Sequence, residues 1–397
     1  MTNPHGLRRE PWRLLFPIGL LALIAGAAHW LAFALGWSHD GGSVFHGIAQ
    51  VQGFVLAFAS GVVLTMLPRR TGTAPPSPGL LGLAVLGTAG TVLAVRFGAV
   101  KEGETLFVLL VLAMLRFVVR ALRSGPRRGP QELGWLALAF AIALCGAVFT
   151  GLGAALGREF FAWHEFGKLC VTQGAVLALM LGAGSVVIPM ATRGELAPDA
   201  SGPRRVLTPA MGLAAIALVA SFALEAFVAY RAGHLLRGLL MLGLLARPLA
   251  LVRPITRPGL EARVLRTALA CVPLGHLVAA LSPWPRLGLH LAYVGGVLPL
   301  VLAVGLHVAR AHAPWRLRVP GERSAAMVCY LACALALALR TAAELEPLHR
   351  TRWLGGAAAA MFTAACASAW LVLPRCWRSR TRDAILSANP DGPRDRG

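Results

Sequence analysis

The chain has 397 residues, of which 57% are hydrophobic and only 14% are charged. Because a soluble globular domain carries about 25% charged residues, this composition excludes an ordinary soluble enzyme and indicates a protein embedded in lipid. The net charge of +21 suggests nucleic acid as a partner only until the basic residues are placed along the chain.

Twelve hydrophobic runs take up most of the chain, and about 20 residues suffice to cross the hydrocarbon core of a bilayer. They predict an all-α, polytopic membrane protein with a single integral membrane domain over residues 1–397, which ends in a basic cytoplasmic tail at 375–397. No cleavable signal peptide is evident, so the first run is expected to stay in the mature protein. The predicted spans are about 14–37, 44–67, 79–95, 104–120, 132–156, 163–190, 206–230, 234–252, 264–282, 286–309, 324–343 and 353–374.

The basic residues follow these spans in an alternating pattern. If the N-terminus is cytoplasmic, 27 of the 38 Lys and Arg residues fall in cytoplasmic segments and 8 in outer segments. This is the positive-inside rule, and it places both termini in the cytoplasm. The charge therefore sets orientation and contacts anionic lipid, and we expect no nucleic-acid binding.

The eighth span is the weakest, because it contains Arg237, Arg247 and Pro248. Without it, the basic segments that follow would lie outside, and the charge rule would be reversed for a third of the chain. We therefore keep it as a span.

Eight of the eleven histidines fall at the outer ends of predicted spans or in outer loops. Imidazole within a membrane is costly without a partner, and it is the commonest protein ligand for metals. This layer predicts a cofactor site near the outer face. Its members are His29, His39, His46, His164, His234, His276, His290 and His349, whereas His5, His307 and His312 lie on the cytoplasmic side.

The second span places His46 and Gln50 four residues apart, on one helix face, with Gly53 on the next turn. A ligating histidine usually donates its second N–H to an oxygen, and Gln50 or a backbone carbonyl would serve. Gly53 would make space for a large, flat group. The alternative is that His46 and Gln50 only join helices by hydrogen bonds.

The sixth span begins with His164, and Glu165 and Lys168 follow within one turn. Lys168 is expected to extend its ammonium group outward to the membrane surface. Pairing with Glu165, or with an anionic group such as a haem propionate, is the alternative.

The ninth and tenth spans form a hairpin around residues 282–285 that places His276 and His290 at similar depth, roughly 9–12 Å below the loop. His29 in the first span shares this depth. Two imidazoles on antiparallel neighbours would bind one metal or bracket a haem, unless they face different partners.

The seventh and eighth spans carry further polar residues. His234 and Arg237 share one face of the eighth span, and Glu225 is the one carboxylate clearly within a predicted span. A buried ion pair with Arg237 or Arg231 is the simplest role for Glu225, and proton handling is the alternative.

Several classes of site are excluded by missing motifs. The chain has no C-x-x-C-H segment, which excludes covalent c-type haem. It lacks Walker, dinucleotide-binding, zinc-protease and serine-hydrolase motifs. It also lacks the adjacent His-His pair, His-x-x-x-Tyr and His-x-His of a terminal oxidase. Whether the protein is an enzyme stays open.

Two segments resemble the NnrS family. Residues 61–72, GVVLTMLPRRTG, are similar to its motif G-F-L-L-T-A-x-P-N-W-T-G at the end of the second span. Upstream, His46 falls on the first histidine of the family's W-H-x-H-E-x-x-x-G-F segment, and Gly53 falls on its glycine. In the tenth span, His290, Gly295 and His312 match the family's H-A-L-T-V-G-x-x-G…R-x-x-L-G-H-T-G-R.

The chain also departs from these motifs. Ile48 and Ala49 replace the family's second histidine and its glutamate, and His307 takes the position of its arginine. The specific motifs cover about 50 residues, whereas the twelve spans match the family's architecture over the whole chain. The chain therefore resembles a divergent member.

The resemblance implies a haem- and copper-containing protein of the bacterial inner membrane, linked to nitric oxide metabolism and nitrosative stress. The resemblance therefore implies a bound haem, expected to be of the b type, and a gaseous ligand such as nitric oxide. Copper stays open because the second histidine and the glutamate are replaced. The resemblance implies that His46 and His290 are metal positions. His312 carries over by alignment alone, and it lies on the opposite membrane face.

The expected cofactor ligands are thus His46, His290 and His164, followed by His276, His29 and His234, with Gln50, Lys168 and Glu165 around them. Two other functions remain: a cofactor-free transporter whose histidines titrate as proton or substrate sites, and an assembly factor for respiratory complexes. The oligomeric state is not predicted.

Overall fold

The computed structural model describes residues 4–38, 43–200, 206–246, 253–257, 259–313, 317 and 319–377. Within these ranges all regular secondary structure is helical and no strand forms, which confirms the predicted all-α class. Eleven helical runs are long and apolar enough to cross a membrane. The α-helices are α1 (Pro4–Arg9), α2 (Trp12–Ala34), α3 (Ser43–Ile48), α4 (Leu56–Thr71), α5 (Pro78–Arg96), α6 (Val100–Ser124), α7 (Gly134–Leu156), α8 (Phe161–Leu169), α9 (Ala175–Arg193), α10 (Pro209–Phe227), α11 (Tyr230–Ala246), α12 (Leu260–Leu281), α13 (Pro285–His290), α14 (Leu298–His312), α15 (Glu322–Leu345) and α16 (Arg350–Trp377).

Six short segments of other helix types join or extend these α-helices. Three are π-helical and lie inside long spans: η1 (Ala49–Val55) joins α3 to α4, η4 (Cys170–Gly174) joins α8 to α9, and η5 (Leu291–Val297) joins α13 to α14. Three are 3₁₀ turns: η2 (Gln131–Leu133), η3 (Arg158–Phe160) and η6 (Pro347–His349).

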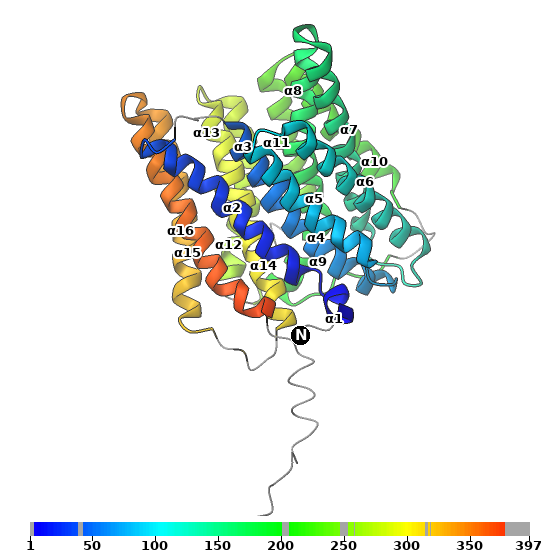
Figure 1. The fold of residues 1–397 in the computed structure, drawn as a ribbon. Helices are drawn as coiled ribbons and strands as arrows, with labels where there is room; N and C mark the ends of the chain where they lie inside the picture. Colours follow the sequence, from blue (N-terminus) through cyan, green and yellow to red (C-terminus); the bar gives the residue numbers. More distant parts are fainter. Residues whose placement is uncertain are drawn as a thin grey trace, which may run out of the picture.

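The helices pack as a bundle in which neighbours in the chain are neighbours in space, and α16 returns to pack against α2 (Figure 1). The start of α2 meets the end of α16, where Arg13 Nε donates to the Cys376 carbonyl over 2.7 Å. The first and last spans therefore begin and end at one face of the bundle, as an even number of crossings requires.

The eighth predicted span is only partly described. Helix α11 covers 17 residues and packs between α10 and α12, but residues 247–252 lie outside the described part of the chain. It does not count among the eleven runs of spanning length. Because the first span begins and the last span ends at one face, a twelfth crossing by α11 is favoured, and it stays a prediction.

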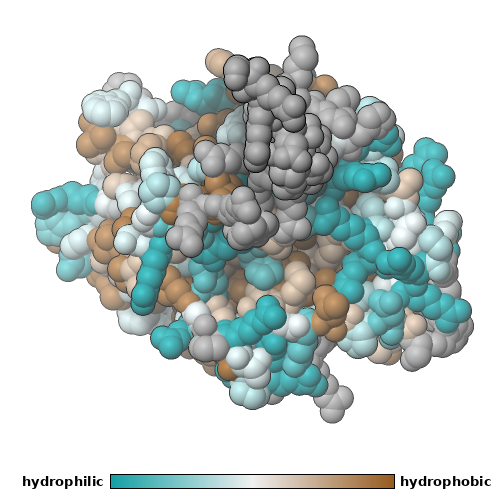
Figure 2. Space-filling model, turned by 90° about the horizontal axis from the view of Figure 1, so that it is seen from below, coloured by the Kyte–Doolittle hydropathy of each residue, from teal (hydrophilic) through white to brown (hydrophobic). Residues whose placement is uncertain are grey.

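The helices that carry His46, His164 and His290 reach the same end of the bundle. Figure 1 shows α3, α8 and α13 at the upper end, opposite α1. We call this end the outer end and the end with α1 the cytoplasmic end, following the charge pattern. Figure 2 looks onto the cytoplasmic end and shows hydrophilic residues spread over much of it among hydrophobic ones.

Glycines let the helices approach closely. A Cβ on Gly275 of α12 would lie 2.5 Å from the Gly288 carbonyl oxygen of α13, so the outer hairpin needs glycine there. Gly53 has a similar role, because a Cβ on it would lie 2.6 Å from Val92 Cγ2 and 2.8 Å from Ala22 Cβ. The expectation that Gly53 makes space for a flat group is therefore wrong: it brings η1 close to α2 and α5.

Candidate functional site

A cavity of about 370 Å³ lies in the outer half of the bundle, within the range of small-molecule pockets. Helices α2, α3, α13, α15 and α16 surround it, together with all three π-helical segments. Most of its lining is apolar. The polar side chains that line it are His46, Gln50, Thr172, Gln173, His290, Tyr293 and Arg340, together with the indole of Trp30.

The π-helical segments converge on this cavity. Segment η1 contributes Gln50, η4 contributes Gln173 and η5 contributes Tyr293. A π-turn holds one more residue than an α-turn, is rare, and occurs frequently at functional sites because it turns side chains out of the regular helical positions. Within the described chain every π-segment is found here, which marks the cavity as the unusual region of the bundle.

His46 lies at the wall of the cavity with its ring fixed by the backbone. Its Nδ1 lies 2.9 Å from the Gly26 carbonyl oxygen. Since a carbonyl only accepts, Nδ1 carries the proton, and Nε2 of the neutral ring carries a lone pair. The carbonyl fills the orienting role for which Gln50 was the other candidate, and Gln50 Nε2 instead donates to the Leu23 carbonyl over 3.3 Å.

His290 has the same arrangement on the tenth span. Its Nδ1 donates to the Arg286 carbonyl over 2.7 Å, so its Nε2 also carries the lone pair. That nitrogen accepts a hydrogen bond from Arg340 Nη2 of α15. Arg340 is not among the site residues that the sequence predicts, and its isolation within an apolar run is the signal that indicates an interior position.

His234 and His276 form a separate pair. Their Nδ1 atoms are 3.1 Å apart and their rings stack, with side chains that are almost completely buried. His234 Nε2 also lies 3.3 Å from Glu225. Of the alternatives for His276 and His290, the structure shows different partners: His276 faces His234, and His290 faces the cavity.

Arg237 connects this pair to the cavity. It forms an ion pair with Glu225 at 2.7 Å and donates to Gln173 Oε1 over 2.7 Å. Because a guanidinium only donates, the Gln173 oxygen must face Arg237, which leaves the amide NH₂ as a donor on the other side. Gln173 lines the cavity, and its NH₂ has no protein partner in the part of the chain that the structure describes.

The sixth-span candidates lie outside the cavity. His164 Nδ1 bonds to the Thr150 carbonyl at 3.0 Å, and the ring does not line the cavity. Lys168 pairs with Glu165 at 2.7 Å while its side chain remains half exposed. Pairing with Glu165, the alternative considered for Lys168, is what the structure shows.

The remaining candidates are also apart from the cavity. His29 packs edge-on against Phe45, with ring centroids 5.4 Å apart. His312 bonds to the Val308 carbonyl and to Arg69 at the cytoplasmic end. It follows His290 by 22 residues on one helical run, a separation of about 33 Å, so the two cannot share a site. His39 lies outside the described residues.

The donor set limits what the cavity can hold. Among the described residues, no group of three His, Cys, Asp or Glu side chains is placed to bind a metal ion. The cavity instead presents two imidazoles, one guanidinium and several uncharged polar side chains, the Gln173 amide among them, within a mainly apolar wall. This combination suits a large apolar group that takes nitrogen ligands and carries a negative charge.

A comparison with protein families identifies the chain. The model described as NnrS protein matches residues 6–380, so the chain belongs to the NnrS family, as its motifs indicated. Searches of curated proteins and of solved structures found no significant match.

Proposed function

We propose that this NnrS-family membrane protein binds haem without a covalent link in the outer cavity, and that the bound haem serves nitric oxide metabolism. One observation carries the proposal. His46 and His290, from the second and tenth spans, line the same cavity, and each ring is oriented by a backbone carbonyl. Metal-ligating histidines typically have this outer hydrogen bond.

The rest of the lining supports the same ligand. The wall is mainly apolar, and a Cβ on Gly47 would meet no atom within 4 Å, so the wall leaves open space beside His46. Arg340 supplies a positive charge for a carboxylate such as a haem propionate. Ligation by His290 would require Arg340 to release Nε2, which would free the guanidinium for that carboxylate.

Haem would supply an iron that can bind nitric oxide. The protein's own residues would exclude water with the apolar wall and orient a bound ligand through hydrogen bonds. Gln173 is suited to this role because Arg237 fixes its amide and no described residue accepts a hydrogen bond from its NH₂. Copper is not included in the proposal, because no group of three His, Cys, Asp or Glu side chains among the described residues is placed to hold a metal ion.

The test is an oxidised-minus-reduced absorbance spectrum of the detergent-purified protein, with haem quantified on the same sample. We expect a Soret band and sharp α and β bands on reduction, and a change in that spectrum when nitric oxide is added without oxygen. His46→Ala or His290→Ala should lose most of the haem while the protein remains folded.

His164→Ala is the matched control. It removes an outer histidine with the same type of backbone hydrogen bond, but one outside the cavity, so it should retain haem. Equal loss in all three variants would contradict the assignment to this cavity. A featureless wild-type spectrum, in a host that loads haem into other membrane proteins, would overturn the haem proposal and favour a cofactor-free transporter.

A further inference from the structure

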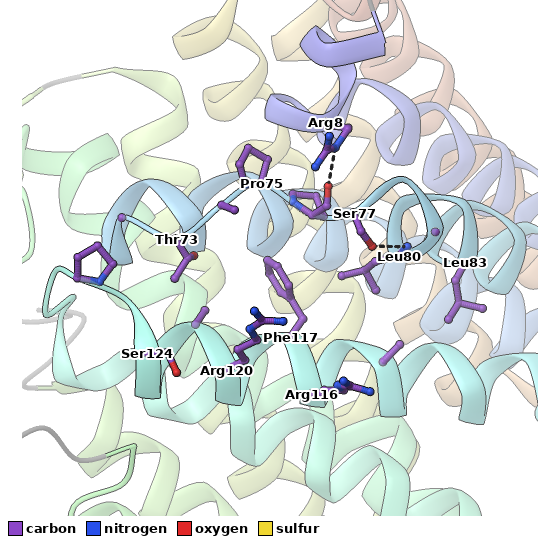
Figure 3. Close-up of a pocket in the computed structure, with 17 residues that line it drawn as sticks. Arg8, Thr73, Pro75, Ser77, Leu80, Leu83, Arg116, Phe117, Arg120 and Ser124 are labelled. Carbon is purple, nitrogen blue, oxygen red and sulfur yellow. Dashed lines mark hydrogen bonds between the residues drawn. The ribbon is translucent and has the colours of Figure 1, made fainter.

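A second and larger pocket opens at the cytoplasmic end of the bundle. Its volume is about 810 Å³, and it lies between α5, α6 and the loop from Gly72 to Ser77. Figure 3 shows Arg116, Phe117 and Arg120 along α6 and, across the pocket, the loop that carries Thr73, Pro75 and Ser77. None of its lining residues lines the outer cavity.

The pocket gathers positive charge without a protein counter-charge. Arg116 and Arg120 are exposed, lie one turn apart on the same face of α6, and have no hydrogen-bond or ion-pair partner in the described part of the chain. Arg8 lines the pocket too and uses its Nε to donate to the Pro76 carbonyl over 3.0 Å. None of the described lining residues is acidic. Like charges four residues apart repel, so an external anion would stabilise this arrangement.

Hydroxyl and backbone groups add to the attraction for an anion. Ser77 caps α5, with its Oγ accepting from the Leu80 N–H over 3.1 Å. The N-terminal end of α5, which carries a partial positive charge, therefore borders the pocket. Thr73 and Ser124 bring further hydroxyls to the lining.

The apolar part of the pocket continues toward the interior of the bilayer. Leu80, Leu83, Ala113 and Phe117 line it beside the arginines. Arg120 lies four residues before the end of α6 and Arg116 eight, depths of roughly 6 and 12 Å. A headgroup layer is about 5–7 Å thick on each side of the hydrocarbon core, and arginine side chains extend toward it. The charges thus reach the phosphate level, and the leucines reach the level of the acyl chains.

We propose that this pocket binds an anionic phospholipid of the cytoplasmic leaflet. Its phosphate is held by Arg116, Arg120 and Arg8, and an acyl chain lies against Leu80, Leu83 and Phe117. A net anionic headgroup is preferred over a zwitterionic one because a choline or ethanolamine would bring a further positive charge beside three guanidinium groups. Basic pockets between membrane helices on this side typically bind such lipids.

The experiment measures thermal stabilisation of the delipidated, detergent-purified full chain. The titrants are phosphatidylglycerol, phosphatidylcholine with the same acyl chains, and inorganic phosphate. We expect saturable stabilisation by phosphatidylglycerol only. The double variant Arg116→Gln, Arg120→Gln should weaken its apparent Kd about 30-fold, since each basic residue near an anionic surface contributes about 1 kcal/mol and 1.4 kcal/mol is tenfold.

Two further variants separate the outcomes. Arg263→Gln with Arg323→Gln removes two exposed arginines from the cytoplasmic ends of α12 and α15, outside the pocket, and should leave the Kd within about twofold. Leu83→Trp should weaken lipid binding by filling the apolar part. Equal binding of the two lipids, or equal loss in both double variants, would overturn the proposal. Full stabilisation by inorganic phosphate, unaffected by Leu83→Trp, would instead show a phosphate site.

Discussion

Arg237 is completely buried and organises the polar interior of the outer half. Its guanidinium bonds to Glu225, Gln173 and Ser221, and packs over the Phe222 ring at 3.9 Å. A buried guanidinium is tolerated only when its charge is compensated and its N–H groups have acceptors. One residue thereby fixes the orientation of the Gln173 amide at the cavity, although Arg237 itself does not line the cavity.

Replacing Glu225 by glutamine should destabilise the protein, because it leaves the Arg237 charge buried without compensation. Breaking a buried ion pair in this way costs about 3–5 kcal/mol. The measurement is the thermal unfolding midpoint in detergent. Glu165→Gln is the control, since it breaks the half-exposed pair with Lys168, which contributes at most about 1 kcal/mol. Equal midpoints in the two variants would show that the Arg237 network does not stabilise the fold.

At the level of single helices, the sequence predicts how deep a residue lies in the membrane better than it predicts which side of the helix the residue occupies. The depth of His290 and the pairing of the ninth and tenth spans follow from residue counts and from the short Ser282–Pro285 turn. The helix face on which each histidine lies does not follow from the sequence, because a helix that is apolar on most sides gives no indication of how it is rotated about its axis. A π-turn such as η5 shifts the faces further without changing composition, so hydrophobic periodicity cannot reveal it.

The close contact between α12 and α13 positions the outer histidines, and it can be tested at Gly275. A valine there would place its Cβ 2.5 Å from backbone atoms of Ala292 and Gly288. Backbone cannot yield as a flexible side chain can, so the helices must separate. We expect Gly275→Val to lower the unfolding midpoint and the haem content together.

Gly243→Val is the matched control for this contact. Gly243 lies in α11, and a Cβ on it would meet no atom within 4 Å. The control should therefore show only the small effect of a β-branched residue on helix propensity. Haem content that is unchanged in Gly275→Val would show that the hairpin contact does not position His290.

At the scale of the whole molecule, charge and fold lead to the same topology by independent routes. The positive-inside rule predicts that both termini are cytoplasmic, and the contact between Arg13 and Cys376 places the start of the first span and the end of the last span at one face. Both arguments need an even number of crossings. Among the described residues only α11, which covers 17 residues, is available to complete the eleven runs of spanning length.

The twelfth crossing can be tested by labelling single added cysteines in spheroplasts with a membrane-impermeant maleimide, against the parent protein as background. If α11 crosses, Arg263→Cys at the start of α12 is cytoplasmic and should react only after lysis. Trp284→Cys, in the outer turn at the other end of the same hairpin, should react in intact spheroplasts. If the pattern were reversed, with Arg263→Cys reacting before lysis and Trp284→Cys only after it, α11 would not cross, and the basic segment from Arg253 to Arg266 would lie outside. The positive-inside rule would then fail for the last third of the chain, although it holds elsewhere.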